Sequence, residues 1–160
     1  MSQKTLFIIR GISGSGKSTL ARLMIERSGS PIPHFEADQY FMFNGHYNFV
    51  PSKLGQAHQW CKESVRTALR TNETVIVSNT FTTKKELFEY LDFLKSEPYT
   101  SSLTISIREP ETEWKSRADI AHEKNTHGVP RHVVENQLNR WYEFPVGDYQ
   151  YNDLMKELEK

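Results

Sequence analysis

The sequence predicts an α/β fold in which a parallel β-sheet is flanked by helices. Three aliphatic or β-branched runs, residues 6–9, 74–78 and 103–107, have the length and composition of buried strands. Segments with helical periodicity lie between them, and strands joined by helices pair in parallel through right-handed crossovers. We therefore expect the carboxyl ends of these strands to meet at one edge of the sheet, where ligands bind in such folds.

The turn after the first strand carries the phosphate-loop pattern, in which two glycines bracket four residues ahead of Lys17 and Ser18. Glycines let successive backbone N–H groups point at one anion, and the following helix adds the positive end of its dipole. Lys17 supplies a charge for the β- and γ-phosphates, and the Ser18 hydroxyl can bind Mg²⁺. Because strand, loop and helix occur in the required order, we predict a P-loop NTPase or kinase fold that binds ATP with Mg²⁺. The residues expected to contact the nucleotide are Gly11, Ser13, Gly14, Ser15, Gly16, Lys17, Ser18 and Thr19.

The composition of the chain restricts its class. Its 160 residues fit one domain, and 20 basic and 20 acidic residues give a net charge of zero. No overall field draws such a protein to nucleic acid or to a membrane surface, so a nucleic-acid substrate needs a local basic patch. The single cysteine, Cys61, excludes an internal disulfide framework and fits a reducing compartment. The sequence has neither an apolar run of membrane-spanning length nor a signal-peptide core, and we predict a cytoplasmic protein.

Turn and cap residues mark the remaining elements of the first half of the chain. Residues 28–31 end the first helix, and residues 33–36 predict a short second strand. Residues 38–51 are aromatic and irregular, with an Asn-Gly turn in the middle. Ser52 is expected to cap a helix that continues to about Arg70.

In the second half, Thr82 or Thr83 is expected to cap the helix that follows the strand at residues 74–78. Residues 111–123 predict a further helix, residues 124–128 a loop, and residues 130–142 a helix that starts at a proline.

The last residues form a separate part of the predicted organisation. We divide the chain into a P-loop kinase domain at residues 1–147 and a charged C-terminal tail helix at residues 148–160. The sequence leaves open whether this tail docks on the domain or on a partner.

Asp38 is the first candidate for catalysis, because it lies just past the second strand and so beside the phosphate loop. A carboxylate there can accept the proton of an attacking hydroxyl, and it can also hold Mg²⁺ through water; a helix N-cap is the alternative. Asn79 and Thr80 follow the strand at residues 74–78, at a place where many phosphate-loop proteins have an acid that organises Mg²⁺. Their side chains can orient the acceptor or metal-bound water by hydrogen bonds, or they can form a turn.

Phosphoryl transfer also needs positive charge over the leaving phosphates, which a mobile lid usually supplies. We predict a helical lid in which Arg117 or Lys124 is the catalytic cation and His127 contacts the substrate; Arg131 is a further candidate. The alternative is that each of these residues is a solvated surface charge. The six histidines of the chain lack metal-ligand spacing, so we predict no zinc site.

Several blocks together resemble the P-loop polynucleotide 5′-hydroxyl kinase family, which includes the kinase domain of the bacteriophage enzyme. They are the phosphate loop, residues 36–41 and residues 75–80. Further blocks resemble a subgroup of small phage and bacterial AAA-type kinase-like proteins, and the likeness extends from Leu6 to about Phe144. Those blocks are residues 38–41, 45–49, 54–60, 79–83 and 125–130.

The resemblance implies a role for each matching residue and also reveals three departures. It implies that Asp38 is the general base, that Lys17 and Ser18 hold phosphates and Mg²⁺, and that residues 125–130 belong to the lid. The departures concern the acceptor and the metal. Phe41 stands where the phage enzyme has an arginine that grips the acceptor phosphate, Ala37 where the subgroup has the first of two adjacent acids, and Ser78 where it has an acid before Asn-Thr.

An aromatic cluster is a second indication of the acceptor. Aromatic faces stack on unpaired bases for about 1–3 kcal/mol each, and Tyr40 and Phe41 are the candidate substrate contacts; core packing is the alternative. The cluster comprises Tyr40, Phe41, Phe43, Tyr47, Phe49 and Trp60.

The sequence therefore predicts an ATP-dependent kinase that transfers the γ-phosphate to a hydroxyl, with the 5′-hydroxyl of a DNA or RNA end as the first choice of acceptor. The same chemistry on a nucleoside, a modified base in DNA or a small metabolite is an alternative. A nucleotide-binding module or ATPase without kinase activity is another, since acids are absent at positions 37 and 78. The oligomeric state does not follow from the sequence.

Overall fold

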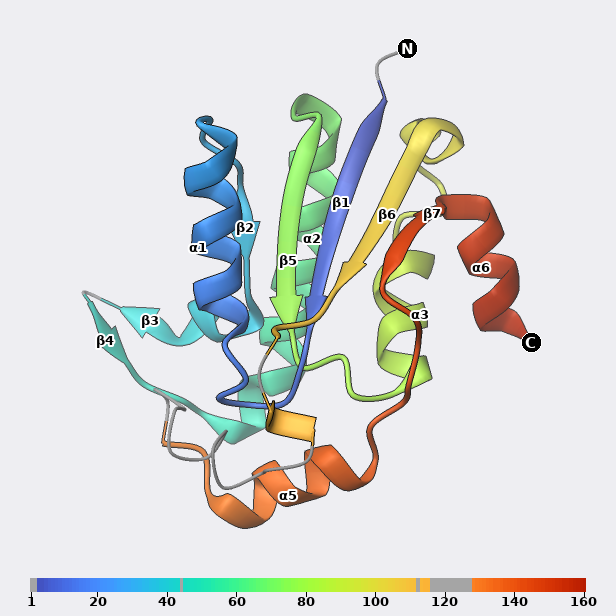
Figure 1. The fold of residues 1–160 in the computed structure, drawn as a ribbon. Helices are drawn as coiled ribbons and strands as arrows, with labels where there is room; N and C mark the ends of the chain where they lie inside the picture. Colours follow the sequence, from blue (N-terminus) through green and yellow to red (C-terminus); the bar gives the residue numbers. More distant parts are fainter. Residues whose placement is uncertain (1–2, 44, 112, 116–127) are drawn as a thin grey trace.

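A mixed five-stranded β-sheet forms the centre of the computed structural model, which describes residues 3–43, 45–111, 113–115 and 128–160 (Figure 1). The strands lie in the order β2, β5, β1, β6, β7. The first four pair in parallel, which confirms the predicted sheet, whereas β7 pairs antiparallel with β6 and was not predicted. Their bounds are Lys4–Arg10 for β1, His34–Phe35 for β2, Thr74–Asn79 for β5, Leu103–Arg108 for β6 and Gly147–Gln150 for β7.

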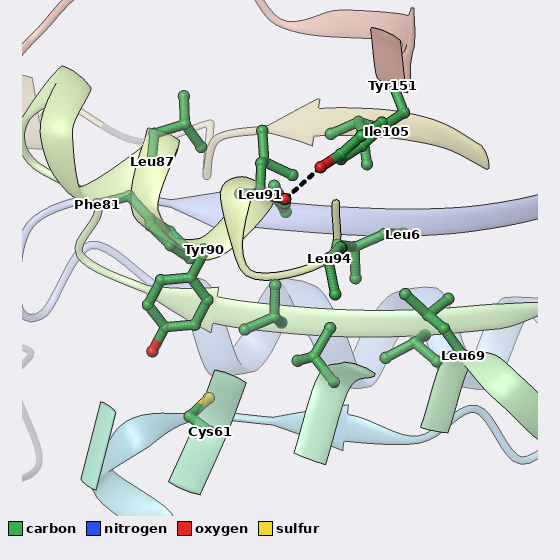
Figure 2. Close-up of a cluster of buried hydrophobic side chains, with 14 of the residues drawn as sticks. Leu6, Cys61, Leu69, Phe81, Leu87, Tyr90, Leu91, Leu94, Ile105 and Tyr151 are labelled. Carbon is green, nitrogen blue, oxygen red and sulfur yellow. Dashed lines mark hydrogen bonds between the residues drawn. The ribbon is translucent and has the colours of Figure 1, made fainter. Parts of the chain in front are cut away.

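Helices cover both faces of this sheet because its strands carry apolar residues on both sides. Leu6 and Ile8 of β1 lie in a core layer with α2, α3 and α6, and Ile9 lies in a second layer with Ala21 of α1. The helices span Lys17–Ser28 for α1, Leu54–Thr71 for α2, Lys84–Asp92 for α3 and Tyr151–Glu159 for α6. The larger layer, part of which Figure 2 shows, joins apolar residues from both halves of the chain.

The C-terminal segment docks on the rest of the fold. β7 extends the sheet beyond β6, and α6 buries Tyr151, Leu154, Met155 and Leu158 in the larger core layer. The Tyr151 hydroxyl donates a hydrogen bond of 2.5 Å to the carbonyl of Leu91 in α3 (Figure 2). Of the two alternatives for the tail, docking on the domain is therefore the observed one.

Helix boundaries confirm some of the expected caps and correct others. The Thr83 hydroxyl accepts a hydrogen bond from the Glu86 N–H at the start of α3, as predicted. The expected cap at Ser52 is wrong, because a 3₁₀ turn at Pro51–Lys53 comes before α2 and Lys53 directly precedes it. The helix predicted for residues 130–142 is α5, Arg131–Asn139. It ends early because the Tyr142 N–H bonds to the Thr82 carbonyl at 2.8 Å instead of continuing the helical ladder.

The aromatic segment after β2 is more regular than expected. A 3₁₀ turn, η1, spans Ala37–Phe41, and two short strands, β3 at Met42–Phe43 and β4 at His46–Tyr47, form an antiparallel hairpin. Gly45 adopts a φ of 79°, which fits the predicted Asn-Gly turn, although residue 44 lies outside the described residues.

Part of the predicted lid lies outside the described residues. Of the helix expected over residues 111–123, the structure describes a 3₁₀ turn at Glu113–Lys115, and residues 116–127 are not described. Within the described ranges, no helix has both the length and the apolar character that crossing a membrane requires.

Candidate nucleotide-binding site

The phosphate loop joins the end of β1 to the start of α1, as the sequence predicts. Gly16, at the residue before α1, has a φ of 104°, a conformation that glycine adopts without strain. A Cβ on Gly11 would overlap the side chain of Ser15. The Ser15 N–H donates to the Ile12 carbonyl at 3.1 Å, so the loop closes on itself ahead of the helix. These constraints place the N-terminal N–H groups of α1 at the carboxyl edge of the sheet, where an anion can bind.

Lys17 lies over this loop. Its Nζ donates to the Ile12 carbonyl at 3.0 Å. Burial lowers the pKa of Lys17 to about 8, although the charges of Glu36 and Asp38 partly oppose this shift. The folded chain therefore holds a desolvated ammonium group at the position where the phosphates of a nucleotide are expected.

Glu36 is the principal functional candidate that sequence reasoning missed. It follows β2 directly, and its Oε1 accepts hydrogen bonds from Ser18 Oγ at 2.5 Å and from Ser78 Oγ at 2.9 Å. His34 Nε2 lies 3.3 Å from the same oxygen and 2.6 Å from Ser78 Oγ. Burial by itself raises the pKa of Glu36, but the contacts with His34, Ser18 and Ser78 outweigh it and lower the pKa to about 2. The predicted second strand, residues 33–36, included Glu36, whereas β2 ends at Phe35 and leaves Glu36 as the first residue after the strand.

Asp38 lies in η1, half-buried, on the same side of the site as Glu36. Its Oδ1 accepts a hydrogen bond of 3.2 Å from the Tyr47 hydroxyl. Burial and the nearby Asp38 carboxylate raise the pKa of Tyr47, so this hydroxyl stays a donor. The Asp38 charge also raises the pKa of Lys17 against the effect of burial, so the two predicted catalytic side chains interact electrostatically.

Asn79, at the end of β5, holds the turn that carries Asp38. Its Oδ1 accepts from the Ala37 N–H at 2.9 Å, and its Nδ2 donates to the Tyr90 hydroxyl at 3.1 Å. The Asn79 side chain is only 8% exposed, and both its oxygen and its nitrogen already have hydrogen-bond partners. It therefore contributes to the site by positioning the backbone next to Asp38. Thr80 contributes through its backbone, since its carbonyl accepts from the Gly11 N–H at 3.3 Å.

The structure separates the aromatic candidates into buried and exposed residues. Phe41 is buried in the larger core layer, where it contacts Phe49 edge to face at 5.1 Å between ring centroids. Tyr40 is 39% exposed, Phe49 43% and Phe43 76%. Tyr47 stacks on Phe49 with an interplanar angle of 2°. Because the Tyr47 hydroxyl bonds Asp38, the exposed ring of Phe49 lies one residue away from the contact with Asp38.

The other predicted lid residues fall into two groups. Arg117, Lys124 and His127 lie outside the described residues, so their placement beside the phosphates stays a prediction. Arg131 is described and forms an ion pair of 2.9 Å with Glu135, one turn further along α5.

α5 reaches the phosphate loop through Gln137, which the sequence did not single out. The Ser13 N–H donates to Gln137 Oε1 at 2.8 Å. Beneath the loop, the buried Arg10 donates to the Phe81 carbonyl at 2.7 Å and lies 4.1 Å from the centroid of the Trp141 ring. Phe81 adopts a φ of 44°, a conformation that costs energy for a residue with a side chain and that turns its carbonyl toward Arg10.

The oxygen-rich surroundings of Ser18 fit Mg²⁺ better than a transition metal. Ser18, Glu36 and Asp38 offer hydroxyl and carboxylate oxygens, the ligands that Mg²⁺ prefers. In the described ranges, no group of three or more His, Cys, Asp or Glu residues forms a complete metal site. An ion bound here would complete its shell with phosphate and water oxygens, as Mg²⁺ does at nucleotide sites.

Two proteins of known name are similar in sequence to this chain. Human NEDD4-binding protein 2 is 31% identical over 140 residues, which cover 87% of this chain and 8% of that protein. Mouse 2′,3′-cyclic-nucleotide 3′-phosphodiesterase is 31% identical over 122 residues, which cover 76% of this chain and 27% of that protein. This chain thus spans a minor part of either relative.

A solved chain from the Pnkp1/Rnl/Hen1 RNA repair complex has the same fold. It superposes with a TM-score of 0.68 at 21% identity, covering 94% of this chain and 49% of that one. The family model described as AAA domain matches residues 6–145, from β1 to the residue after Phe144. The match contains the phosphate loop, strands β2, β5 and β6 and helices α1, α2, α3 and α5, and the chain belongs to the AAA domain family of P-loop kinase-like proteins.

Proposed function

We propose that this protein is a kinase that transfers the γ-phosphate of ATP to the 5′-hydroxyl of a DNA or RNA end. The observation that carries the proposal is the position of Asp38. Its charge acts on Lys17, and its Oδ1 accepts a hydrogen bond from the Tyr47 hydroxyl, whose ring stacks on the exposed ring of Phe49. A general base in a kinase must reach both the phosphoryl donor and the acceptor hydroxyl. For Asp38, the phosphate loop with Lys17 is the candidate donor site, and the exposed aromatic residues are the candidate acceptor site.

Each residue of the site has a distinct task in this reaction. The loop N–H groups and Lys17 would bind the β- and γ-phosphates and neutralise the charge that develops on the leaving group. Asp38 would take the proton of the attacking hydroxyl while the new O–P bond forms and the bond to ADP breaks. Mg²⁺, when bound at Ser18, would neutralise further phosphate charge. The lid cation, Arg117 or Lys124, stays a prediction in this scheme.

The acceptor is proposed from the surface next to Asp38. Tyr40, Phe43 and Phe49 expose aromatic rings there, and bases stack on such rings with little regard to sequence. The stretch from Gln39 to Lys62 contains no Asp or Glu, in a chain with 20 acids, so it does not repel a phosphate backbone. The solved chain with the same fold comes from an RNA repair complex, which supports a nucleic-acid end as acceptor.

The test is transfer of label from γ-labelled ATP with Mg²⁺ to 5′-hydroxyl DNA and RNA oligonucleotides, to nucleosides, and to no acceptor. We expect label on oligonucleotide ends, and we expect Asp38→Asn and Lys17→Ala to remove it. Asp153→Asn and Lys156→Ala are matched controls on the exposed side of α6, and they should retain transfer.

The outcomes separate the alternatives. Label on nucleosides alone would keep the phosphoryl transfer and reject the nucleic-acid acceptor. Binding of ATP without label on any acceptor would reject the kinase and leave a nucleotide-binding module.

A further inference from the structure

We propose that Glu36 supplies the acidic group of the Mg²⁺ site, in the place of the acid that phosphate-loop proteins commonly carry at the end of the strand that corresponds to β5. In this chain that position is Ser78. The inference rests on the proposed nucleotide chemistry, and it deepens that proposal by assigning the metal and the acceptor to two different carboxylates.

The sheet places these two positions side by side. β2 and β5 are neighbours, with Phe35 paired to Val77, so Glu36, the residue after β2, lies beside Ser78 near the end of β5. The Ser78 hydroxyl donates to Glu36 Oε1 at 2.9 Å. A serine Oγ stands about where the Cγ of an aspartate would stand, so Glu36 brings its charge next to the place of a carboxylate at position 78.

The same oxygen of Glu36 also reaches the phosphate loop. Ser18 Oγ donates to Glu36 Oε1 at 2.5 Å. Because the hydroxyl proton of Ser18 is directed at Glu36, the lone pairs of its oxygen remain for a cation. A serine in this position of the loop is the one that holds Mg²⁺ in phosphate-loop proteins.

The local contacts hold Glu36 in its charged form and in one orientation. Its side chain is 17% exposed, so leaving it without partners would be costly. His34 Nε2 lies 2.6 Å from Ser78 Oγ, and with a proton on Nε2 it donates to this oxygen and leaves the Ser78 hydroxyl proton for Glu36. Such outer hydrogen bonds orient the groups around a metal and change its affinity.

With Glu36 as the carboxylate of the Mg²⁺ site, Asp38 acts as the general base alone. Asp38 Oδ1 accepts a hydrogen bond from the Tyr47 hydroxyl of the hairpin, whereas Glu36 Oε1 accepts one from Ser18 of the loop. The sequence had left Asp38 with two roles, base and Mg²⁺ holder, and the structure assigns the second role to Glu36.

The experiment measures how much Mg²⁺ tightens the binding of a non-hydrolysable ATP analogue, by titration calorimetry with Mg²⁺ and with EDTA. Binding of Mn²⁺ to the protein–analogue complex, followed by electron paramagnetic resonance, gives a second readout. We expect Glu36→Gln, which keeps an oxygen acceptor for Ser18, to reduce the Mg²⁺ effect and the Mn²⁺ affinity about 10- to 100-fold. Affinity in EDTA should not fall.

The decisive variant moves the acid. The double variant Glu36→Ser, Ser78→Asp should recover most of the Mg²⁺ effect, and Glu36→Ser alone should not. Asp38→Asn should leave the Mg²⁺ effect within about threefold while it removes transfer. Thermal unfolding of each variant confirms that it is folded.

Three results would overturn the inference: an unchanged Mg²⁺ effect in Glu36→Gln, a folded double variant without recovery, or loss of the Mg²⁺ effect in Asp38→Asn. The proposed function fails separately. If the analogue binds with a Mg²⁺ effect that depends on Glu36 but no acceptor gains label, the kinase proposal is rejected and the metal assignment stands.

Discussion

The phosphate loop and the acidic turn, which we define as residues 36–38, lie on two sides of the same candidate site and are held in different ways. The loop closes on itself, because Lys17 Nζ and the Ser15 N–H both donate to the Ile12 carbonyl. Its backbone also bonds other elements, through the N–H groups of Gly11 and Ser13. The acidic turn is held by side chains from other elements, including Asn79 on the Ala37 N–H and Tyr47 on Asp38.

This difference determines what a substitution does. A change at the Lys17 side chain should alter function with little effect on stability, because its hydrogen bond stays within the loop. A change in the contacts of the acidic turn should alter both, because the same hydrogen bonds satisfy buried groups and position Asp38.

The largest expected effect comes from Lys17→Met. Removing the ammonium from the leaving phosphates should lower phosphoryl transfer at least about 100-fold. The unfolding temperature at pH 7 should stay the same or rise, because the pKa of Lys17, lowered to about 8 by burial, shows that the fold destabilises this charge. Lys156→Met on the exposed side of α6 is the control. A clear drop in unfolding temperature would show that the Lys17 side chain supports the fold.

Asn79→Ala should affect both function and stability. It leaves the buried Ala37 N–H without its acceptor, which costs about 1–3 kcal/mol, and frees the turn that carries Asp38. We expect an unfolding temperature lower by several degrees and a transfer rate lower by up to about 100-fold. Calorimetric unfolding and the labelling assay measure the two effects, with Asn152→Ala on α6 as the matched variant. Retention of full stability would show that Asn79 is not the anchor of the turn.

The same difference explains which parts of the site the sequence predicted. The strand–loop–helix pattern needs only neighbouring residues, so Gly11 to Ser18 and the buried strands were identified correctly as fold elements. Glu36 was passed over because its importance depends on Ser18 and Ser78, which only the pairing of β2 with β5 brings to it. Gln137 was passed over for a similar reason, since it meets Ser13 from a helix far along the chain.

Among the fold elements, the edge of the sheet was the least predictable. β7 alternates half-buried and exposed residues in a polar segment, so it lacks the apolar run that marks β1, β5 and β6. Its position comes from pairing with β6 and from the apolar side of α6 that follows it. For the aromatic segment, composition could not distinguish Phe41, which the core buries, from Phe43, which remains exposed.

Tyr47→Phe should have a smaller effect, because it removes one contact of the acidic turn. The ring keeps its stacking on Phe49, and only the hydroxyl bond to Asp38 is lost. We expect kcat to fall within about tenfold, which corresponds to about 1.4 kcal/mol, while KM for ATP and the unfolding temperature change little. Tyr149→Phe, whose hydroxyl bonds the Pro145 carbonyl near the edge of the sheet, is the control for loss of a hydroxyl. An effect on KM for ATP without an effect on kcat would place Tyr47 in nucleotide binding instead.

The smallest expected effect is a pH dependence of stability at His58, which supports the acidic turn indirectly. His58 Nδ1 lies 2.7 Å from the Tyr90 hydroxyl that in turn bonds Asn79. Burial, assisted by the Lys62 charge, lowers the pKa of His58 against the opposing charges of Glu86, Asp38 and Glu89.

A folded-state pKa below the unfolded value means that the unfolded chain binds more protons, so stability should fall as pH drops below about 6.5. The contribution of His58 has an upper limit of about 1.4 kcal/mol per pH unit. His58→Gln should therefore lose less stability than the parent chain between pH 7 and pH 5 in denaturant titrations. His132→Gln, on the exposed side of α5, should behave like the parent. Equal losses in His58→Gln and the parent would show that the buried support of the turn does not depend on a neutral His58.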